Sequence, residues 1–187
     1  MKAKPVRLAI IGTGGMANFQ AQKFLAIPGV RLAAVCDVDE SRARDFAARH
    51  APGALVFTDS AALLRDAAVD AVSIVAPDAF HAPLALQALA AGRHVLCEKP
   101  LATNHRDAKR MAAAAAKAGV VNMVNFSYRN APAIQKAAQL VASGKLGDVV
   151  HLEASYLQSW LTSKSWGDWR TSPGWLWRLS TKHGSLG

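Results

Sequence analysis

Short apolar runs alternate with amphipathic segments over the first two thirds of the chain. The first run, VRLAII at residues 6–11, is typical of a strand that is covered on both faces. Similar runs recur along the chain, and segments with helical spacing of apolar residues separate them. The pattern predicts strands at residues 6–11, 31–37, 54–57, 70–76, 94–98 and 120–126, and helices at 18–27, 41–50, from 59 or 60 onward, 81–91 and 104–119.

The helix ends carry their own signals. Ser41, either Asp59 or Ser60, and Asn104 each stand where a side-chain oxygen can cap the start of a helix. Gly119 follows the longest helical segment, where a glycine commonly ends a helix. These signals support the predicted helix boundaries.

Six strands separated by helices predict an α/β fold with a doubly wound parallel sheet. Right-handed crossovers bring the carboxyl ends of such strands to one edge, where ligands bind. After residue 126 the pattern changes: a helix is expected at residues 132–143, and DVVHLEASYLQ at 148–158 alternates like an antiparallel strand with one solvated face. We therefore predict a first domain at residues 1–127 and the beginning of an α+β domain, which looks incomplete, at residues 128–187.

Composition and charge narrow the function classes. The chain has 187 residues, of which 51% are hydrophobic, so it can bury a core. Its net charge of +9 comes without a basic run or a basic helix face, so we expect no nucleic-acid partner. The apolar runs are too short to span a bilayer or to form a signal peptide, which favours a cytoplasmic protein without a membrane segment. Cys36 and Cys97 fit no metal-binding spacing, and no metal site is expected.

A glycine-rich loop, GTGGMA at residues 12–17, lies between the first predicted strand and the first predicted helix. Gly12 permits a tight turn, Gly14 lets the backbone approach a pyrophosphate, and Ala17 is small enough for the helix to pack on the sheet. The helix N-terminus adds free amides and partial positive charge that favour phosphates. A glycine triplet alone is weak evidence, but its place between a strand and a helix predicts a dinucleotide site.

Asp37 ends the second predicted strand. A carboxylate there can accept both hydroxyls of the adenosine ribose and would repel a 2′-phosphate, which favours NAD over NADP. Arg42 complicates this prediction, because its guanidinium could stack on adenine or pair with a phosphate. The alternatives are a solvated strand-end Asp and a surface Arg. NAD is therefore the expected cofactor, and NADP remains possible.

The fifth predicted strand ends in an acid, a base and a proline, which are Glu98, Lys99 and Pro100. Beside a nicotinamide, an ammonium can hydrogen-bond the oxygen of an alcohol substrate, stabilise the developing alkoxide and relay its proton. The alternative is a surface Lys paired with Glu98, although neighbours in a strand point to opposite faces. This stretch predicts that Lys99 is catalytic.

The fourth predicted strand ends at Pro77, after which Asp78 and His81 would project over the same edge. Taken alone, His81 is more simply explained as the first residue of a helix, without a role in chemistry. The expectation that it faces a cofactor depends on the wider pattern.

Taken together, GTGGMA, VAPDAFHAPLALQALAAGRHVLCEKPLATN and SGKLGDVV resemble the Gfo/Idh/MocA family of oxidoreductases. The resemblance covers essentially the whole chain, and its Glu-Lys-Pro block is a specific motif. It implies a Rossmann domain followed by a substrate domain with a large, mostly antiparallel open sheet. It also implies hydride transfer between NAD(P) and a secondary alcohol carbon of a sugar or cyclic polyol.

The resemblance implies a role for each of a set of residues. Glu98 and Lys99 would lie beside the nicotinamide ribose and the reacting carbon, and Pro100 is often cis in this family. The other cofactor contacts would be Gly12, Thr13, Gly14, Gly15, Met16 and Ala17 at the pyrophosphate, Asp37 and Arg42 at the adenosine, Ala76, Pro77, Asp78 and His81 along the nicotinamide, and Asn125, Trp169 and Arg170.

The family's second domain carries an Asp followed four residues later by a His, usually assigned as the general base. Residues 128–187 contain no Asp-x-x-x-His. We therefore expect the chain alone to bind NAD with roughly micromolar affinity and to turn over poorly. The alternative is an NAD-binding module that acts through a partner. The resemblance also implies a homo-oligomer when the protein is complete.

Overall fold

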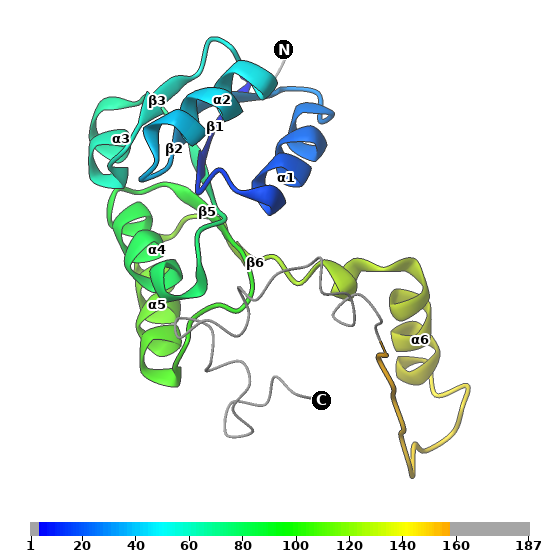
Figure 1. The fold of residues 1–187 in the computed structure, drawn as a ribbon. Coiled ribbons are helices and arrows are strands. Elements are labelled where there is room, and N and C mark those ends of the chain that lie inside the picture. Colours follow the sequence, from blue (N-terminus) through cyan, green and yellow to red (C-terminus); the bar gives the residue numbers. More distant parts are fainter. Residues whose placement is uncertain (1–3, 158–187) are drawn as a thin grey trace. The chain divides into compact units, whose positions relative to one another are not determined.

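The computed structural model describes residues 4–157 (Figure 1). Six strands form one sheet in the order β3-β2-β1-β4-β5-β6, and every neighbouring pair is parallel. This order confirms the predicted doubly wound α/β fold. The strands are β1 (Val6–Ile11), β2 (Val30–Cys36), β3 (Leu55–Phe57), β4 (Ala71–Ile74), β5 (His94–Cys97) and β6 (Asn122–Val124).

The helices lie between the strands and follow the last one. They are α1 (Gly15–Leu25), α2 (Glu40–His50), α3 (Ser60–Asp66), α4 (His81–Ala90), α5 (His105–Ala118) and α6 (Pro132–Ala142), with short 3₁₀ turns at Asp78–Phe80 and Ser127–Asn130. The predicted cap at Asn104 is confirmed, since its side chain accepts a hydrogen bond from the Asp107 amide. The cap predicted at Ser41 is wrong: Asp39 accepts from the Arg42 amide instead and starts the helix earlier.

Helices cover the sheet from two sides, and alternate residues of β1 belong to two cores. Leu8 and Ile10 pack with α1 and α2, whereas Ala9 and Ile11 pack with α3, α4 and α5. In Figure 1, α4 and α5 run side by side. Burial on both faces explains why the strands read as nearly continuous apolar runs in the sequence.

The strand order reverses between β1 and β4, which places a topological switch point at their carboxyl ends. We call the edge formed by the carboxyl ends of the strands the carboxyl edge. Gly12, Asp37, Val75 and Glu98 directly follow β1, β2, β4 and β5 there, respectively. The residues with predicted chemistry therefore gather along one edge of one sheet.

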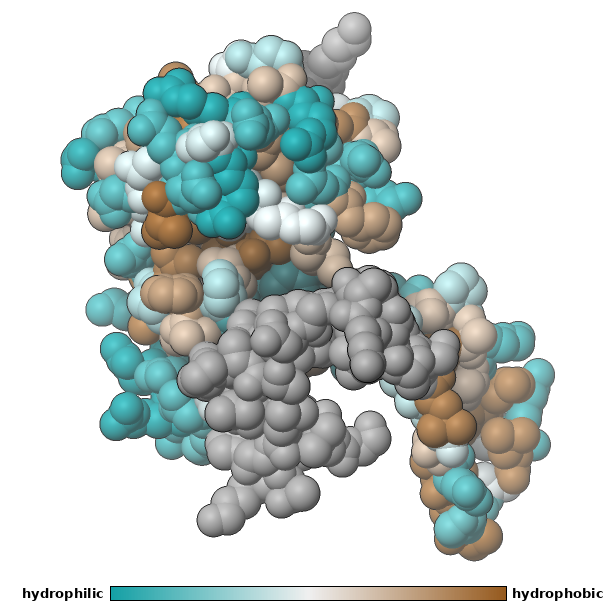
Figure 2. Space-filling model, in the orientation of Figure 1, coloured by the Kyte–Doolittle hydropathy of each residue, from teal (hydrophilic) through white to brown (hydrophobic). Residues whose placement is uncertain are grey.

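The chain divides into two compact units, residues 1–126 and residues 127–187. The described part of the second unit contains α6 and exposes apolar side chains, visible as brown atoms on this unit in Figure 2. The strand predicted at residues 148–158 is not formed in residues 148–157. A strand requires a partner for its backbone N–H and C=O groups, and no other strand lies in the described part of this unit.

Between residues 4 and 157, no helix has the length and apolar character needed to cross a membrane. The same residues contain no cluster of His, Cys, Asp and Glu that could hold a metal ion. Cys36 and Cys97 are buried free thiols.

Candidate functional site

The glycine loop between β1 and α1 lies tightly against the end of β4. Gly12 has a φ of +90°, and a Cβ at this position would lie 2.8 Å from the backbone of Val75 and Ala76. Any other residue would therefore meet both a strained backbone conformation and a steric clash. A Cβ on Gly14 or Gly15 would meet no atom within 4 Å. The loop therefore requires glycine at Gly12 for packing and leaves open space over Gly14 and Gly15.

Helix α1 begins within this glycine-rich stretch, at Gly15, three residues before the predicted start at Asn18. Its N-cap, Gly14, has no side chain to occupy the first-turn amides, and Gly14, Gly15 and Met16 are exposed. Free amides and the helix dipole make this end of the helix suitable for an anionic group such as a phosphate. Ala17 of α1 is buried, as expected for a small residue at the contact between the helix and the sheet.

The Asp37 carboxylate joins the glycine loop to the end of β2. It accepts hydrogen bonds from the amide and hydroxyl of Thr13, at 2.8 and 2.9 Å, and from the Asp39 amide at 3.1 Å. Arg42 adds a two-pronged ion pair, with its Nη2 2.6 Å and its Nε 3.1 Å from the two carboxylate oxygens. The predicted ribose acceptor is therefore occupied by groups of the protein itself.

These contacts determine the protonation of Asp37. Burial raises the pKa of the carboxyl group, but hydrogen bonds from Arg42, Thr13 and Asp39 outweigh burial and lower the pKa to about 2. The group is therefore ionised at neutral pH. Since Arg42 is half exposed, it can leave Asp37 more easily than buried Thr13 can.

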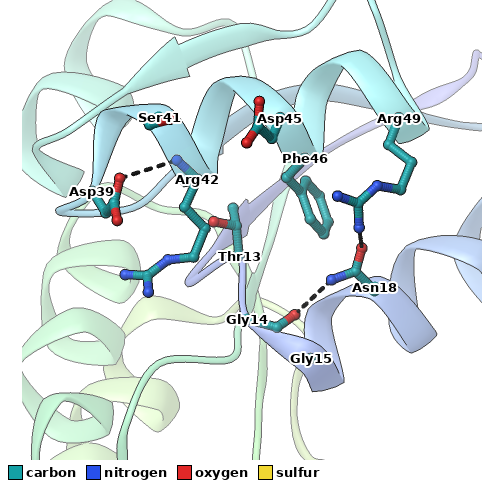
Figure 3. A pocket seen from close by; sticks show the side chains of 10 residues that line it. All are labelled: Thr13, Gly14, Gly15, Asn18, Asp39, Ser41, Arg42, Asp45, Phe46 and Arg49. Carbon is teal, nitrogen blue, oxygen red and sulfur yellow. Dashed lines mark hydrogen bonds between the residues drawn. The ribbon is translucent and has the colours of Figure 1, made fainter.

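A pocket of about 380 Å³ lies between the glycine loop and α2 (Figure 3). In Figure 3, side chains of α2 face the loop, and Asn18 lies between Gly14 and Arg49. Asn18 donates to the Gly14 carbonyl and accepts from Arg49 at 2.8 Å. The lining residues are Thr13, Gly14, Gly15, Asn18, Asp39, Ser41, Arg42, Asp45, Phe46 and Arg49. The places of Asn18 and Arg49 in this pocket could not be predicted from the sequence, because a polar residue on a helix surface gives no signal of its own.

The second group of predicted residues lies at the ends of β4, β5 and β6. Glu98 is 8% exposed and accepts hydrogen bonds from Gln20 and Asn125, both at 2.6 Å, and from the Lys99 amide at 3.1 Å. The Lys99 side chain is exposed and makes no ion pair with Glu98. The alternative of a surface Lys99–Glu98 salt bridge therefore does not hold. The Lys99–Pro100 peptide is cis, as the resemblance implied.

His81 differs from its predicted orientation. It is 1% exposed, and its ring nitrogens lie 2.6 Å from the Pro100 carbonyl and 2.9 Å from the Ala76 carbonyl. Asp78 is also buried. Both side chains are therefore buried at the carboxyl edge, where the 3₁₀ turn at Asp78–Phe80 leads into α4. His81 thus ties the loop after β4 to the turn after Lys99.

The structure therefore brings most of the predicted residues into two groups at one edge. Thr13, Gly14, Gly15 and Arg42 line the pocket beside Asp37, whereas Ala76, His81, Glu98, Lys99 and Asn125 gather at the ends of β4, β5 and β6. Pro77 is exposed next to Ala76. Trp169 and Arg170 lie outside the described residues. Their roles in cofactor binding stay predictions.

The stability contribution of Asp37 should depend on pH. Its pKa is lower in the folded chain than in the unfolded chain, so the contribution is present above about pH 4 and is lost as the pH falls toward about 2. We expect Asp37→Asn to lower the free energy of unfolding by about 2 kcal/mol at pH 7. Urea unfolding of both proteins between pH 7 and pH 3 should show this difference shrinking. Exposed Asp66→Asn is the control, and a difference independent of pH would contradict the assignment.

Replacing His81 should destabilise the carboxyl edge. His81→Leu removes the ring that lies between the Ala76 and Pro100 carbonyls and the N–H that donates to one of them, and we expect a loss of about 2 kcal/mol in the free energy of unfolding. The control is His105→Leu at the exposed start of α5, with an expected change of no more than about 0.5 kcal/mol. Equal urea midpoints for the two variants would show that the two His81 contacts contribute nothing.

Comparison with known proteins places this geometry in a family. A family model described as oxidoreductase family, NAD-binding Rossmann fold, matches residues 6–126. Inositol 2-dehydrogenase of Rubrobacter xylanophilus is 40% identical over 144 residues, which is 76% of this chain and 41% of that protein. D-glucoside 3-dehydrogenase of Escherichia coli is 37% identical over 150 residues, covering 80% of this chain and 42% of that protein.

Solved structures agree with these sequence matches. The structure of scyllo-inositol dehydrogenase from Lactobacillus casei with bound NAD(H) and scyllo-inositol aligns with a TM-score of 0.72 at 28% identity. The alignment covers 78% of this chain and 43% of that one. The chain thus spans less than half the length of each of these relatives. Because the family model matches most of the chain and the fold is shared with these enzymes, the chain belongs to the Gfo/Idh/MocA oxidoreductase family with an NAD-binding Rossmann fold.

Proposed function

We propose that this chain binds NAD and serves an oxidoreductase that transfers a hydride between nicotinamide and a secondary alcohol carbon of a sugar or cyclic polyol. One observation carries the proposal: a glycine loop with free helix amides and a Glu98–Lys99 pair lie on either side of one topological switch point. The names of the relatives, which include inositol and glucoside dehydrogenases, support this substrate class.

The residues present fit a dinucleotide. The open space over Gly14 and Gly15 and the exposed first-turn amides suit a pyrophosphate. For Asp37 to accept the adenosine ribose hydroxyls, Arg42 leaves the carboxylate, and its half-exposed side chain can then lie on the adenine. A carboxylate at this place disfavours a 2′-phosphate, so NAD is the preferred cofactor. Residues 1–127 supply these contacts, and residues 128–187 belong to the substrate domain.

Bound NAD would supply a hydride acceptor, and the chain would supply Lys99 for the proton. Lys99 is exposed at the end of β5, and its ammonium makes no ion pair in the described part of the chain. It can hydrogen-bond the substrate oxygen, stabilise negative charge that develops there and accept or relay the proton when deprotonated. His81 holds the turn that follows Lys99 through the Pro100 carbonyl.

A second candidate function is an NAD-binding module without catalysis of its own. The observation that favours it is that the family model matched at residues 6–126 is that of an NAD-binding Rossmann fold. Such a module would bind the cofactor through the same residues and would depend on a partner for the second acid–base group. Turnover by the 187-residue chain separates the two functions.

Two glycine variants test the cofactor site. Gly14→Ala should leave stability unchanged, since its Cβ meets no protein atom, but should weaken NAD binding at least about tenfold by blocking the pyrophosphate. Gly12→Ala should instead destabilise the fold by about 2 kcal/mol or more, because its Cβ meets the β4 backbone. Calorimetric NAD titration and urea unfolding measure the two effects. Unaltered NAD affinity in Gly14→Ala would remove the loop from the cofactor site.

Turnover tests the role of Lys99. The chain is mixed with NAD and a panel of inositols and glucosides, and reduction of the cofactor is followed by absorbance. We expect little turnover by the chain alone. Where any is measured, Lys99→Ala should lower kcat by at least about 100-fold and leave the Kd for NAD within about twofold. Exposed Lys117→Ala is the control, and unchanged kcat in Lys99→Ala would exclude Lys99 from the mechanism.

A further inference from the structure

A buried hydrogen-bond chain runs from the middle of the sheet to the carboxyl edge. The Ser73 hydroxyl on β4 donates to Gln20 Oε1 at 2.6 Å, and Gln20 Nε2 on α1 donates to Glu98 Oε1 at 2.6 Å. Asn125 Nδ2 donates to the same Glu98 oxygen at 2.6 Å. Ser73 is fully buried, and Gln20 is 5% exposed. We call Ser73, Gln20, Glu98 and Asn125 the Glu98 network.

The contacts of Glu98 determine which group donates and which accepts in each hydrogen bond of the Glu98 network. Every contact to Glu98 comes from an N–H group, which suits an ionised carboxylate because it can only accept. Gln20 must therefore turn its amide nitrogen toward Glu98 and its oxygen toward Ser73, and the Ser73 hydroxyl must donate. Ser73 thereby fixes Gln20, and Gln20 fixes Glu98.

Glu98 differs from Asp37 in the charge of its partners. Both are acids at the carboxyl edge, and both are 8% exposed. Asp37 is paired with the guanidinium of Arg42. Among residues 4–157, no Lys, Arg or His nitrogen lies within 4.0 Å of Glu98, and all its hydrogen-bond donors are neutral. A buried carboxylate without a cation has a strong preference for a positive charge nearby.

The two acids lie in opposite halves of the sheet. Asp37 follows β2, in the half formed by β1, β2 and β3, and Glu98 follows β5, in the half formed by β4, β5 and β6. A dinucleotide bound across the switch point places one nucleoside over each half. With the adenosine at Asp37, the nicotinamide lies on the side of Glu98. The nicotinamide ring carries a positive charge in NAD⁺ and none in NADH.

We propose that Glu98 selects the oxidised cofactor by charge, and that Gln20 and Ser73 are positioning residues that hold its carboxylate for this purpose. The proposal rests on the proposed function, because it requires NAD at the carboxyl edge. The three neutral donors hold the Glu98 carboxyl group in place and bring no positive charge to it. The remaining attraction goes to the nicotinamide cation, which favours binding of NAD⁺ over NADH.

The test is the ratio of two dissociation constants measured on the 187-residue chain. NAD⁺ and NADH are titrated separately by calorimetry, since the two ligands differ mainly in the charge of one ring. Glu98→Gln should weaken NAD⁺ about tenfold and NADH less than about twofold, as expected for loss of one charge within a few ångströms. Gln20→Met and Ser73→Ala should shift the ratio in the same direction, by about threefold, while the carboxylate itself is retained.

The chain offers a matched control pair. Ser60 donates to Gln87 Oε1 at 2.8 Å, which is the same kind of contact on an exposed surface. Ser60→Ala and Gln87→Met should leave the NAD⁺ to NADH ratio unchanged. Circular dichroism at the titration temperature shows which variants are folded. If Gln20→Met is not folded, Ser73→Ala, which is the smaller change, tests the positioning role alone.

The outcomes separate this proposal from the function on which it rests. If wild-type chain binds neither NAD⁺ nor NADH, the proposed function fails. If both bind and Glu98→Gln weakens them equally, Glu98 does not select by charge and the inference is wrong. If Glu98→Gln shifts the ratio but folded Gln20→Met and Ser73→Ala do not, the positioning role of Gln20 and Ser73 is overturned.

Discussion

The close approach of Gly12 to the end of β4 is the constraint on which the carboxyl edge depends. With a hydrogen atom in place of a side chain, the backbone after β1 passes within contact distance of Val75 and Ala76. This approach sets where α1 begins and how it lies on the sheet. Gln20, five residues into α1 from Gly15, then meets Ser73 on β4 and Glu98 after β5. The close approach of this one glycine thus underlies both the open start of α1 and the buried polar contacts behind it.

Buried polar groups at this edge are satisfied by neighbours from distant parts of the sequence. Asp37 takes its donors from the glycine loop and from α2, whereas Glu98 takes its donors from α1 and from the residue after β6. His81 meets carbonyls from two different loops. Because an unsatisfied buried polar group costs about 1–3 kcal/mol, each of these contacts also stabilises the packing of the strand ends. The site and the fold of the edge are therefore not separable.

The helices, the strands and the gathering of polar residues at the carboxyl edge could be predicted from the sequence. The hydrogen-bond partners of those residues could not. Apolar runs predicted all six strands, since each strand of a covered parallel sheet is apolar on both faces. The pairing of Arg42 with Asp37 was not predictable, because it depends on how α2 starts relative to the end of β2. Gln20 and Ser73 resemble any helical Gln and strand Ser until the packing of α1 on β4 is known. His81 was expected to project over the carboxyl edge, and only the fold shows that it is buried between the Ala76 and Pro100 carbonyls.

The two acids of the carboxyl edge, Asp37 and Glu98, are similar groups with different partners. In the free protein, Arg42 compensates the charge of Asp37. In the proposed complex, the uncharged hydroxyls of a ribose take the place of Arg42. Glu98 has only neutral donors, so no cation of the described residues pairs with it. Burial is the same for both. The difference lies in a single guanidinium, and it is the basis of the proposal that Asp37 meets a ribose and Glu98 a positively charged ring.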